Sequence, residues 1–487
     1  MTDINTQQET IEAPTLVKSS QISKFKPLTS LDSPKVHGLP VLDVFKNHLN
    51  SAEFGKGDGN AFFVADLGEI YRQHVRWMTN LPRIEPFYAV KCNSDPMVLR
   101  LLTSLGAGFD CGTKYEIEAV LKAGVDPSNI VYAHPCKQNS FLNYARDVDV
   151  SMMTFDNIEE LYKIKKLYPQ AQCIIRILVD DTNSHGRLGL KFGAPMDKVN
   201  GLLLKARELE LNVIGVSFHV GSYCVDAVAF RDALVRARYV FTQAKVEYGY
   251  DFKLLDIGGG FLSDSETTVA IRSNFEEVAE VVTRAVDLLF ESDIRVIAEP
   301  GRYYVNSAFT LAAQVIGRRS LVVKPPSSPN HFIRTPPLSP VSDSSPDSGS
   351  SSDSSPGADA QYMYYLNDGI FGSFAAIKYF PRDCSPKALR SGGKFVYHQQ
   401  KPRQQQKYQG ELPYNGTHTK AIVWGPTLAN PDCITMEATM PVLQNGDWVY
   451  YEDVGAYSIA VATEFHGIPP NDVLYTATEP AVFDYLL

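Results

Sequence analysis

Short apolar runs alternate with longer amphipathic segments over the first two-thirds of the chain. Segments such as MVLRLLTSL and KYEIEAVLKAG have apolar positions three and four residues apart, which predicts helices. The runs between them are rich in β-branched and aromatic residues, as is typical of buried strands. We expect eight strands, within residues 87–91, 107–111, 130–134, 151–156, 173–178, 213–220, 254–259 and 295–300.

Eight strands that alternate with helices favour parallel pairing. The predicted fold is therefore an α/β chain built on a (β/α)8 barrel, which takes about 250 residues. A doubly wound open sheet is the alternative. From about Leu311 onward the runs TLAAQVIGRR, YMYYLND, AIVWG, DWVYYED and YSIAVAT follow one another without helical segments. This change predicts a C-terminal β-sheet or β-barrel domain.

The chain has 487 residues, enough for both units. We place the barrel at residues 67–306 and the β domain at residues 39–66 and 307–487. Residues 1–38 are polar, and we expect a disordered N-terminal segment. Residues 325–359 are rich in serine and proline and hold too little apolar surface to offset the entropy of ordering, so we expect a disordered loop there.

Composition excludes several classes of protein. The net charge of −9 argues against a nucleic-acid-binding protein, which usually presents a basic face. No stretch approaches 18 uninterrupted apolar residues, so we expect no membrane span. The seven cysteines are scattered and include no C-x-x-C pair, and the first residues are polar and acidic. A reduced, cytoplasmic chain fits these features better than a secreted one.

Polar or glycine residues follow most of the predicted barrel strands. Active sites of such barrels lie at the carboxyl ends of the strands, so these residues are expected to meet at one rim. They are Lys91, Asp110, His134, His219, Glu299 and the run Gly258-Gly259-Gly260. Because so many of these groups occur at the carboxyl ends of predicted strands, the sequence predicts a catalytic site there.

The residue types suggest a cofactor with an aldehyde and a phosphate. Burial of Lys91 at a strand end is expected to lower its pKa, which would let it form a Schiff base; a lysine that extends its head into water is the alternative. Three glycines let backbone N–H groups approach a phosphate, although a tight turn explains them equally well. Arg302, in GRYYV, offers a forked donor to the same phosphate.

Glu299 and His219 complete this set. A carboxylate beside a pyridine nitrogen keeps that nitrogen protonated, which makes the ring an electron sink. A carboxylate paired with an arginine is the alternative for Glu299. His219 is placed to stack on such a ring, and a core histidine with satisfied hydrogen bonds is its alternative.

These residues belong to longer motifs that occur in one order along the chain. The motifs are PFYAVKCN (86–93), GFDCGTKYEIE (108–118), SFHVGS (217–222), LDIGGGF (255–261), AEPGRYYV (298–305), YYLNDGIFGSF (364–374), WGPT (424–427) and GDWVYYEDVGAY (446–457). Together they resemble the eukaryotic ornithine decarboxylase family. Apart from the loops, the resemblance covers roughly residues 13–487.

The resemblance implies a fold type III enzyme that binds pyridoxal 5′-phosphate (PLP) in its barrel and uses no metal. It also implies a head-to-tail homodimer with active sites shared between subunits, and Lys91 and His219 as catalytic residues. Substrate-binding positions are Asn367, Asp368 and Phe465. The cofactor-binding positions implied are Lys91, Asp110, Glu116, Arg187, His219, Ser222, Gly258, Gly259, Gly260, Glu299, Pro300, Gly301, Arg302 and Tyr457.

The chain departs from the family pattern near the expected substrate. Family members usually have Cys-Asp after WGPT, and this chain has Leu428 and Ala429. In the family the cysteine delivers a proton to the α-carbon, and the aspartate grips the distal amine. Tyr223 stands where HVGSG is usual, and His466 follows TEF where asparagine is usual. Either of these two residues is a candidate to replace the missing proton donor.

Three functions fit these observations. The first is a decarboxylase for a bulkier ornithine-like amino acid, as in fungal alkaloid synthesis of the loline type, whose substrate bears a proline ring. The second is ordinary ornithine decarboxylase in polyamine synthesis, which releases putrescine. The third is a non-catalytic regulator that binds an antizyme-like inhibitor protein. The intact set of PLP positions argues against the third.

Overall fold

A computed structural model describes residues 34–52, 54, 59–182, 184–224, 226–263, 273–321, 360–378, 384–396 and 418–486. The predicted loop at 325–359 and the predicted N-terminal segment up to residue 33 lie outside these residues. Strand β1 (Val36–His37) pairs in parallel with β20 (Asp472–Thr476). This corrects the expectation of disorder through residue 38, because these two residues are held by backbone pairing.

Eight parallel strands close into a barrel, which confirms the predicted (β/α)8 fold. The open-sheet alternative is wrong, because β12 pairs with β3 and completes the ring. All eight strands overlap the apolar runs identified in the sequence, although β3, β7 and β9 begin before the predicted runs. They are β3 (Ile84–Ala89), β4 (Gly108–Cys111), β5 (Ile130–Tyr132), β6 (Met152–Phe155), β7 (Gln172–Arg176), β9 (Asn212–Ser217), β11 (Leu254–Asp256) and β12 (Arg295–Ala298).

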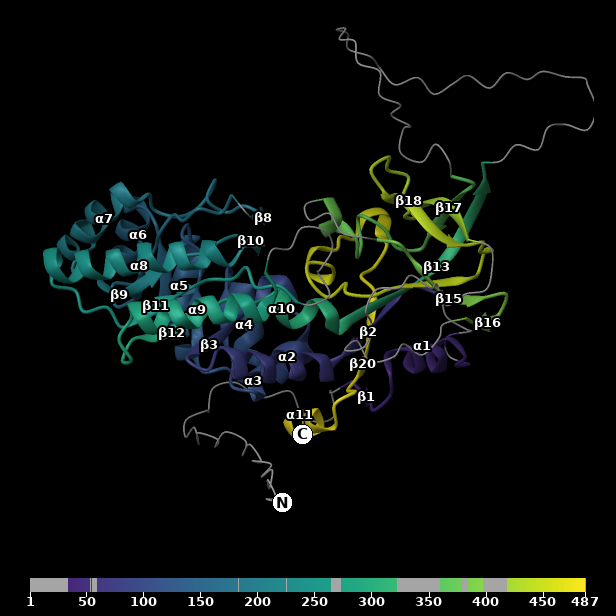
Figure 1. The fold of residues 1–487 in the computed structure, drawn as a ribbon, viewed down its shortest axis with the longest axis horizontal. Coiled ribbons are helices and arrows are strands. Elements are labelled where there is room, and N and C mark those ends of the chain that lie inside the picture. Colours follow the sequence, from purple (N-terminus) through teal and green to yellow (C-terminus); the bar gives the residue numbers. More distant parts are fainter. Residues whose placement is uncertain are drawn as a thin grey trace, which may run out of the picture.

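Helices surround the barrel, as Figure 1 shows. Several begin where the sequence supplies an N-cap side chain: Asp95 accepts from two backbone N–H groups, and Asn274 forms a capping box with Glu277. The helices are α2 (Leu67–Asn80), α3 (Pro96–Ser104), α4 (Lys114–Lys122), α5 (Asn139–Asp147), α6 (Ile158–Leu167), α7 (Met196–Glu208), α8 (Ala227–Tyr248), α9 (Phe275–Leu289) and the single turn α10 (Arg302–Val305).

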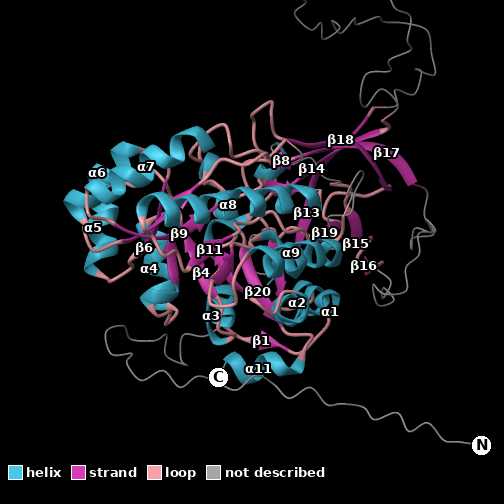
Figure 2. Ribbon diagram, turned by 60° about the vertical axis from the view of Figure 1, so that its left-hand side comes forward, coloured by secondary structure: helices cyan, strands magenta, loops and turns pink. Residues whose placement is uncertain are grey.

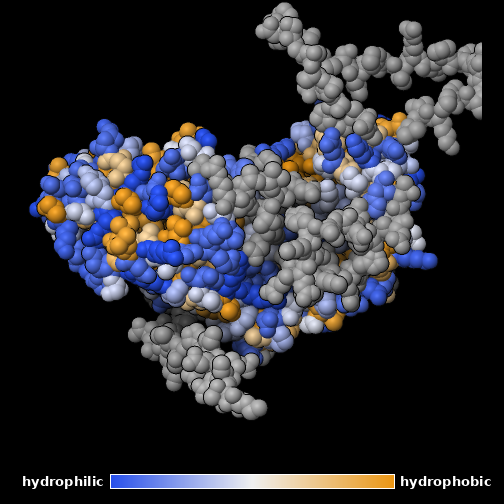
Figure 3. All heavy atoms as spheres, viewed as in Figure 1, coloured by the Kyte–Doolittle hydropathy of each residue, from blue (hydrophilic) through white to orange (hydrophobic). Residues whose placement is uncertain are grey.

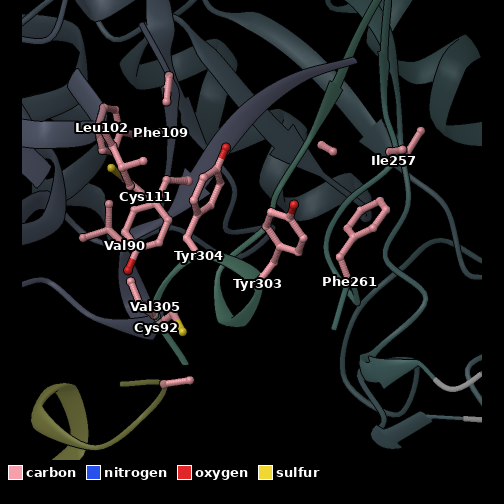
Figure 4. Packing of buried hydrophobic residues seen from close by; sticks show 14 of the residues in the cluster. Val90, Cys92, Leu102, Phe109, Cys111, Ile257, Phe261, Tyr303, Tyr304 and Val305 are labelled. Carbon is pink, nitrogen blue, oxygen red and sulfur yellow. The ribbon is translucent and has the colours of Figure 1, made fainter. Parts of the chain in front are cut away.

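The interior of the barrel is packed with side chains rather than open. Phe87, Met152 and Ile297 belong to an apolar cluster inside the ring. A second layer of aromatic residues lies where α10 meets the barrel, with Tyr303 and Tyr304 fully buried (Figure 4). This packing anchors α10, and therefore Arg302 at its first position, against the barrel.

The remaining strands build a ten-stranded sheet beside the barrel (Figure 2). Residues from both ends of the chain meet in it, because β2 pairs with β13 and with β20. The strands are β1, β2 (Phe62–Asp66), β13 (Phe309–Ser320), β14 (Tyr362–Leu366), β15 (Lys387–Ser391), β16 (Lys394–Phe395), β17 (His418–Trp424), β18 (Cys433–Pro441), β19 (Trp448–Tyr451) and β20.

Two short helices and a small ribbon complete the described fold. Helix α1 (Val41–Leu49) packs on the sheet, and α11 (Phe483–Leu486) contacts α3. Strands β8 (Ser184–Gly186) and β10 (Ser222–Cys224) form an antiparallel ribbon. The surface of the barrel helices is mainly hydrophilic with scattered apolar side chains, as Figure 3 shows. Such a surface suits a chain with a net charge of −9.

Candidate active site

A cavity of about 480 Å³ lies at the carboxyl ends of the barrel strands, where the barrel faces the sheet domain. Lys91, His219 and Arg302 line it from the barrel, and Tyr457 lines it from the sheet domain. Its size falls within the range of small-molecule sites. The cavity therefore brings together residues that lie more than 360 positions apart in the sequence.

Lys91 lies in a single 3-10 turn, Val90–Cys92, directly after β3. Its Nζ donates a hydrogen bond to Oδ2 of the buried Asp110, and its side chain is 41% exposed toward the cavity. Burial acts to lower the pKa of Lys91, but the carboxylates of Asp110 and Glu299 outweigh it and raise the pKa above its usual value. The expected fall in pKa is thus wrong for this structure, because the sequence did not reveal that two carboxylates face the amine.

Glu299 lines the cavity and forms a buried acidic pair with Asp256. Burial raises the pKa of Glu299 well above its usual range, and the nearby Asp110 and Asp256 raise it further. Burial also raises the pKa of Asp256 to about 7. Oδ1 of Asp256 accepts the backbone N–H of Gly258 at 2.9 Å. Glu299 is the carboxyl of this pair that lines the cavity, where it can contact a ring nitrogen.

His219 is half-buried at the cavity, and its surroundings favour the neutral ring. Burial lowers the pKa of His219 well below its usual value, and the charges of Arg176 and Lys91 lower it further. Nδ1 accepts the backbone N–H of Gly221 at 3.0 Å, so the proton of the neutral ring is on Nε2. A neutral, fixed imidazole offers a flat face on which an aromatic ring can stack.

The other end of the cavity carries donors for an anion. Nε of Arg302 donates to Oγ of Ser222 at 3.1 Å, and its guanidinium lies 4.7 Å from the centre of the Tyr457 ring. Gly258 and Gly260 adopt positive φ values of 64° and 111°. A Cβ on Gly258 would lie 2.2 Å from the carbonyl oxygen of Phe218. Only glycine can keep the backbone this close, so the turn stays open to a phosphate.

These residues fit PLP. Arg302, Ser222 and the glycine turn suit its phosphate, Glu299 suits its ring nitrogen, and Lys91 suits its aldehyde. When bound, PLP would supply an electron sink for electrons released at the carbon next to the substrate's nitrogen. The chain would supply the carboxyl of Glu299 at the ring nitrogen, the ring of His219 against one face, and the amine of Lys91 held by Asp110.

The remaining predicted cofactor positions surround this set. Arg187 lines the cavity and donates to the carbonyl of Thr182 at 3.0 Å. Glu116 accepts the backbone N–H of Gly112 near the start of α4, and burial raises the pKa of Glu116. Gly301 lines the cavity and packs closely on Cys92, where a Cβ would come within 2.9 Å. The carbonyl of Pro300 accepts the N–H of Ala89, which fixes the end of β12 to β3.

The residues expected to contact substrate lie elsewhere, around a hollow of about 20 Å³ in the sheet domain. Asp368 and Phe465 line it, and Asp368 is buried. Burial raises the pKa of Asp368, whose Oδ1 accepts the N–H groups of Gly369 and Ser373. The hollow shares no lining residue with the cavity of Lys91. It has room for about one water molecule, so within one chain it cannot hold an amino-acid side chain.

Leu428 and Ala429 directly follow Thr427, which lines the same hollow. The Leu428 side chain is 91% exposed in the single chain. Asn367 lines neither space. Its amide oxygen accepts the N–H of Gln314 at 2.8 Å, and its amide nitrogen donates to the carbonyl of Gly59 at 2.9 Å. The structure therefore gives Asn367 a part in holding the sheet domain together.

Sequence reasoning missed Asn471, Asp256 and His185. Nδ2 of Asn471 donates to Oδ2 of Asp368 at 2.6 Å and to Oγ of Ser373 at 3.0 Å. Asn471 lies in a polar loop that carries no motif, so nothing in the sequence pointed to it. Asp256 stands inside the motif LDIGGGF, and His185 lies two residues before Arg187, so their positions were the available signal.

None of the seven cysteines forms a disulfide bond. Within the described ranges, no group of three or more His, Cys, Asp or Glu side chains could hold a metal ion. In the same part of the chain, every helix is too short or too polar to cross a lipid bilayer.

Comparison with known proteins agrees with the site. A family model described as the pyridoxal binding domain of pyridoxal-dependent decarboxylases matches residues 67–306. An ornithine decarboxylase from Neurospora crassa is 46% identical over 434 residues, covering 88% of this chain and 83% of the relative. Antizyme inhibitor 2 from Xenopus laevis is 42% identical over 426 residues, covering 87% of this chain and 82% of that protein.

A solved structure shares the fold. The arginine decarboxylase of Paramecium bursaria Chlorella virus superposes with a TM-score of 0.72 at 29% sequence identity. The match covers 89% of this chain and all of the viral protein. Similarity therefore extends over the barrel and the sheet domain together.

Proposed function

The chain belongs to the eukaryotic ornithine decarboxylase family and is a PLP-dependent decarboxylase, and from this premise we propose that its substrate is a modified, ornithine-like amino acid. The proposed substrate keeps a positively charged distal nitrogen but carries a larger group on it than ornithine does. A basic amino acid whose distal nitrogen bears a proline ring, as in alkaloid synthesis of the loline type, has this character. We propose a cytoplasmic location for the enzyme.

The observation that carries this proposal is the pair Leu428-Ala429 beside the hollow of Asp368. Family members usually have a cysteine and an aspartate there, so ornithine would lose one of the two carboxylates that hold its ammonium. Removing one partner of a buried charge pair costs about 2–5 kcal/mol of binding free energy. Alanine also frees space, and leucine adds apolar surface. The site therefore favours binding of a bulkier distal group over binding of the ammonium of ornithine.

We propose that the working enzyme is a head-to-tail homodimer. The hollow of Asp368 and the cavity of Lys91 share no residue within one chain, which supports a site completed by a second subunit. The exposed Leu428 would then lie against the partner's cavity. In a shared site of this kind, one subunit binds the cofactor and the other contributes the residues that bind the distal end of the substrate.

Two other functions have some support. Ordinary ornithine decarboxylase is favoured by the 46% identity to the Neurospora enzyme. A regulator that binds an antizyme-like inhibitor protein is favoured by the 42% identity to antizyme inhibitor 2. The assembled set of Lys91, Glu299 and Arg302 supports an enzyme, because a regulator has no need of these residues at one cavity.

The double substitution Leu428→Cys with Ala429→Asp tests the proposal. It restores a thiol and a second carboxylate, so we expect kcat/KM for ornithine to rise by about tenfold or more, a gain of at least about 1.4 kcal/mol in transition-state binding. The matched control is Leu428→Ser with Ala429→Asn, which has nearly the same shapes but lacks the thiol and the charge. An equal response of ornithine turnover in both variants would refute the role given to this pair.

A further inference from the structure

Tyr223 adopts an unusual backbone conformation at the edge of the cofactor cavity. Its φ is 60°, in the left-handed region that a bulky side chain rarely occupies. Of the described non-glycine residues, the others with positive φ are Asp149, Glu210, Asp453, Tyr457 and His466. Strain of this kind persists only where surrounding contacts compensate for it, and it often marks functional sites.

The contacts of Tyr223 converge on one arginine. The Arg302 guanidinium lies 4.5 Å from the centre of the Tyr223 ring and 4.7 Å from the centre of the Tyr457 ring. Both tyrosines are among the residues with positive φ. Two strained aromatic residues on the same guanidinium are a combination that simple packing does not require.

The local fold holds the Tyr223 ring in place. Tyr223 is the middle residue of β10, which pairs with β8 through Ser222 opposite Gly186. The His185 ring of β8 packs edge-on against Tyr223, with ring centres 5.9 Å apart. The neighbouring Ser222 accepts the hydrogen bond from Nε of Arg302. The β8–β10 ribbon thus contacts the guanidinium twice, with the Tyr223 ring and with the Ser222 hydroxyl.

We propose that Tyr223 is a positioning residue for the cofactor's phosphate, acting through Arg302. An aromatic ring beside the carbon of a guanidinium does not use its N–H groups as donors, and a restrained side chain loses less entropy when it binds an anion. The strained backbone of β10 is the means by which the ring reaches that face. This inference rests on the PLP cofactor and does not depend on which amino acid is the substrate.

The test compares affinity for PLP with affinity for pyridoxal, which lacks the phosphate. Tyr223→Asn removes the ring and keeps a residue that tolerates positive φ; Tyr223→Phe keeps the ring. We expect Tyr223→Asn to weaken PLP binding about tenfold, within the range of a desolvated cation–π contact, and to leave pyridoxal binding within about twofold. Tyr223→Phe should retain the affinity of the unmodified chain for PLP. Absorbance titration of the cofactor-free protein measures both constants.

Other outcomes would overturn the proposal. Equal weakening for PLP and pyridoxal would place the effect on the ring of the cofactor or on the fold. A loss of PLP affinity in Tyr223→Phe as large as that in Tyr223→Asn would assign the role to the hydroxyl. Glu210→Asn is the matched control, because Glu210 has φ 53° at the exposed end of α7, outside the residues that line the cavity. It should change neither affinity, and a change would mean that relief of backbone strain alone alters binding.

Discussion

Burial and neighbouring carboxylates set the charge of each residue at the site. The same burial that raises the pKa of Glu299 lowers that of His219, because one is an acid and the other a base. Lys91 departs from this rule only because Asp110 and Glu299 face it. The resting site thus combines a histidine whose neutral form is favoured, a lysine held by Asp110, and the buried acidic pair of Glu299 and Asp256.

A buried histidine outside the site predicts how the stability of the fold depends on pH. His74 of α2 is buried, and burial lowers its pKa to about 4. Its Nδ1 lies 3.1 Å from the hydroxyl of Tyr304. Between pH 6.5 and pH 4, His74 is protonated in the unfolded chain but stays neutral in the folded chain. The free energy of unfolding therefore decreases as the pH falls through this range.

We expect His74 to account for about 1 kcal/mol of the stability lost between pH 7.5 and pH 5.5. His74→Gln should show a correspondingly smaller drop in unfolding midpoint between these two pH values. Urea unfolding of both proteins at both pH values measures the difference. An equal drop in the two proteins would mean that His74 titrates in the folded chain as it does in water.

At the scale of elements, the barrel strands were predictable and the connections were not. A run such as CIIRIL has no reading other than a buried strand between two helices. The β8–β10 ribbon arises from three-residue strands without apolar alternation, so no periodicity identifies it. Their positions at the ends of predicted strands allowed Lys91, His219 and Glu299 to be assigned to one site, because closure of a barrel brings those ends to one rim. The same argument could not identify Asn471, because Asn471 contacts Asp368 from a loop rather than from a barrel strand.

The loop before Tyr457 is an element whose geometry depends on one glycine. A Cβ on Gly455 would lie 1.8 Å from the carbonyl oxygen of Val305, which is backbone and cannot move aside. The N–H of Gly455 donates to the carbonyl of Asn306, and its carbonyl accepts from Asn93. This close approach joins the sheet domain to the barrel and sets the position of Tyr457.

Gly455→Ala should therefore destabilise the chain by about 1–3 kcal/mol and weaken PLP binding, because the loop must move away from α10. The control is Gly201→Ala in α7, where no atom lies within 4 Å of the added Cβ. That change should stabilise the chain by up to about 1 kcal/mol and leave PLP binding unchanged. Urea unfolding and cofactor titration measure both effects. Similar stability of the two variants would contradict the close packing at Gly455.

At the scale of the whole molecule, the chain assembles a candidate cofactor site from two domains but leaves the residues expected to contact substrate apart from it. Tyr457 comes from the sheet domain and reaches the cavity, whereas Asp368 of the same domain does not. This separation could not be foreseen from the order of the motifs, because the motifs do not show which of them act within one subunit. It is the reason for proposing a shared site.

Mixing two inactive variants tests sharing between subunits. Lys91→Ala and Asp368→Ala should each be inactive alone. After random exchange of equal amounts, half of the dimers are mixed, and each mixed dimer has one intact site of two. About a quarter of the normal activity should then return. A mixture of Lys91→Ala with Glu299→Ala should stay inactive, because both residues line the same cavity of one chain. Failure of the first mixture to regain activity would contradict a shared site.

The most direct measurement is carbon dioxide release by the purified protein with PLP, from ornithine, lysine, arginine and an N-substituted ornithine analogue that bears a proline ring. The account predicts that kcat/KM is highest for the N-substituted amino acid, because Ala429 frees space, Leu428 adds apolar surface, and only Asp368 remains to hold the distal charge. A higher kcat/KM for ornithine would contradict it, and would show that this site uses the substrate of its relatives without the usual cysteine and aspartate.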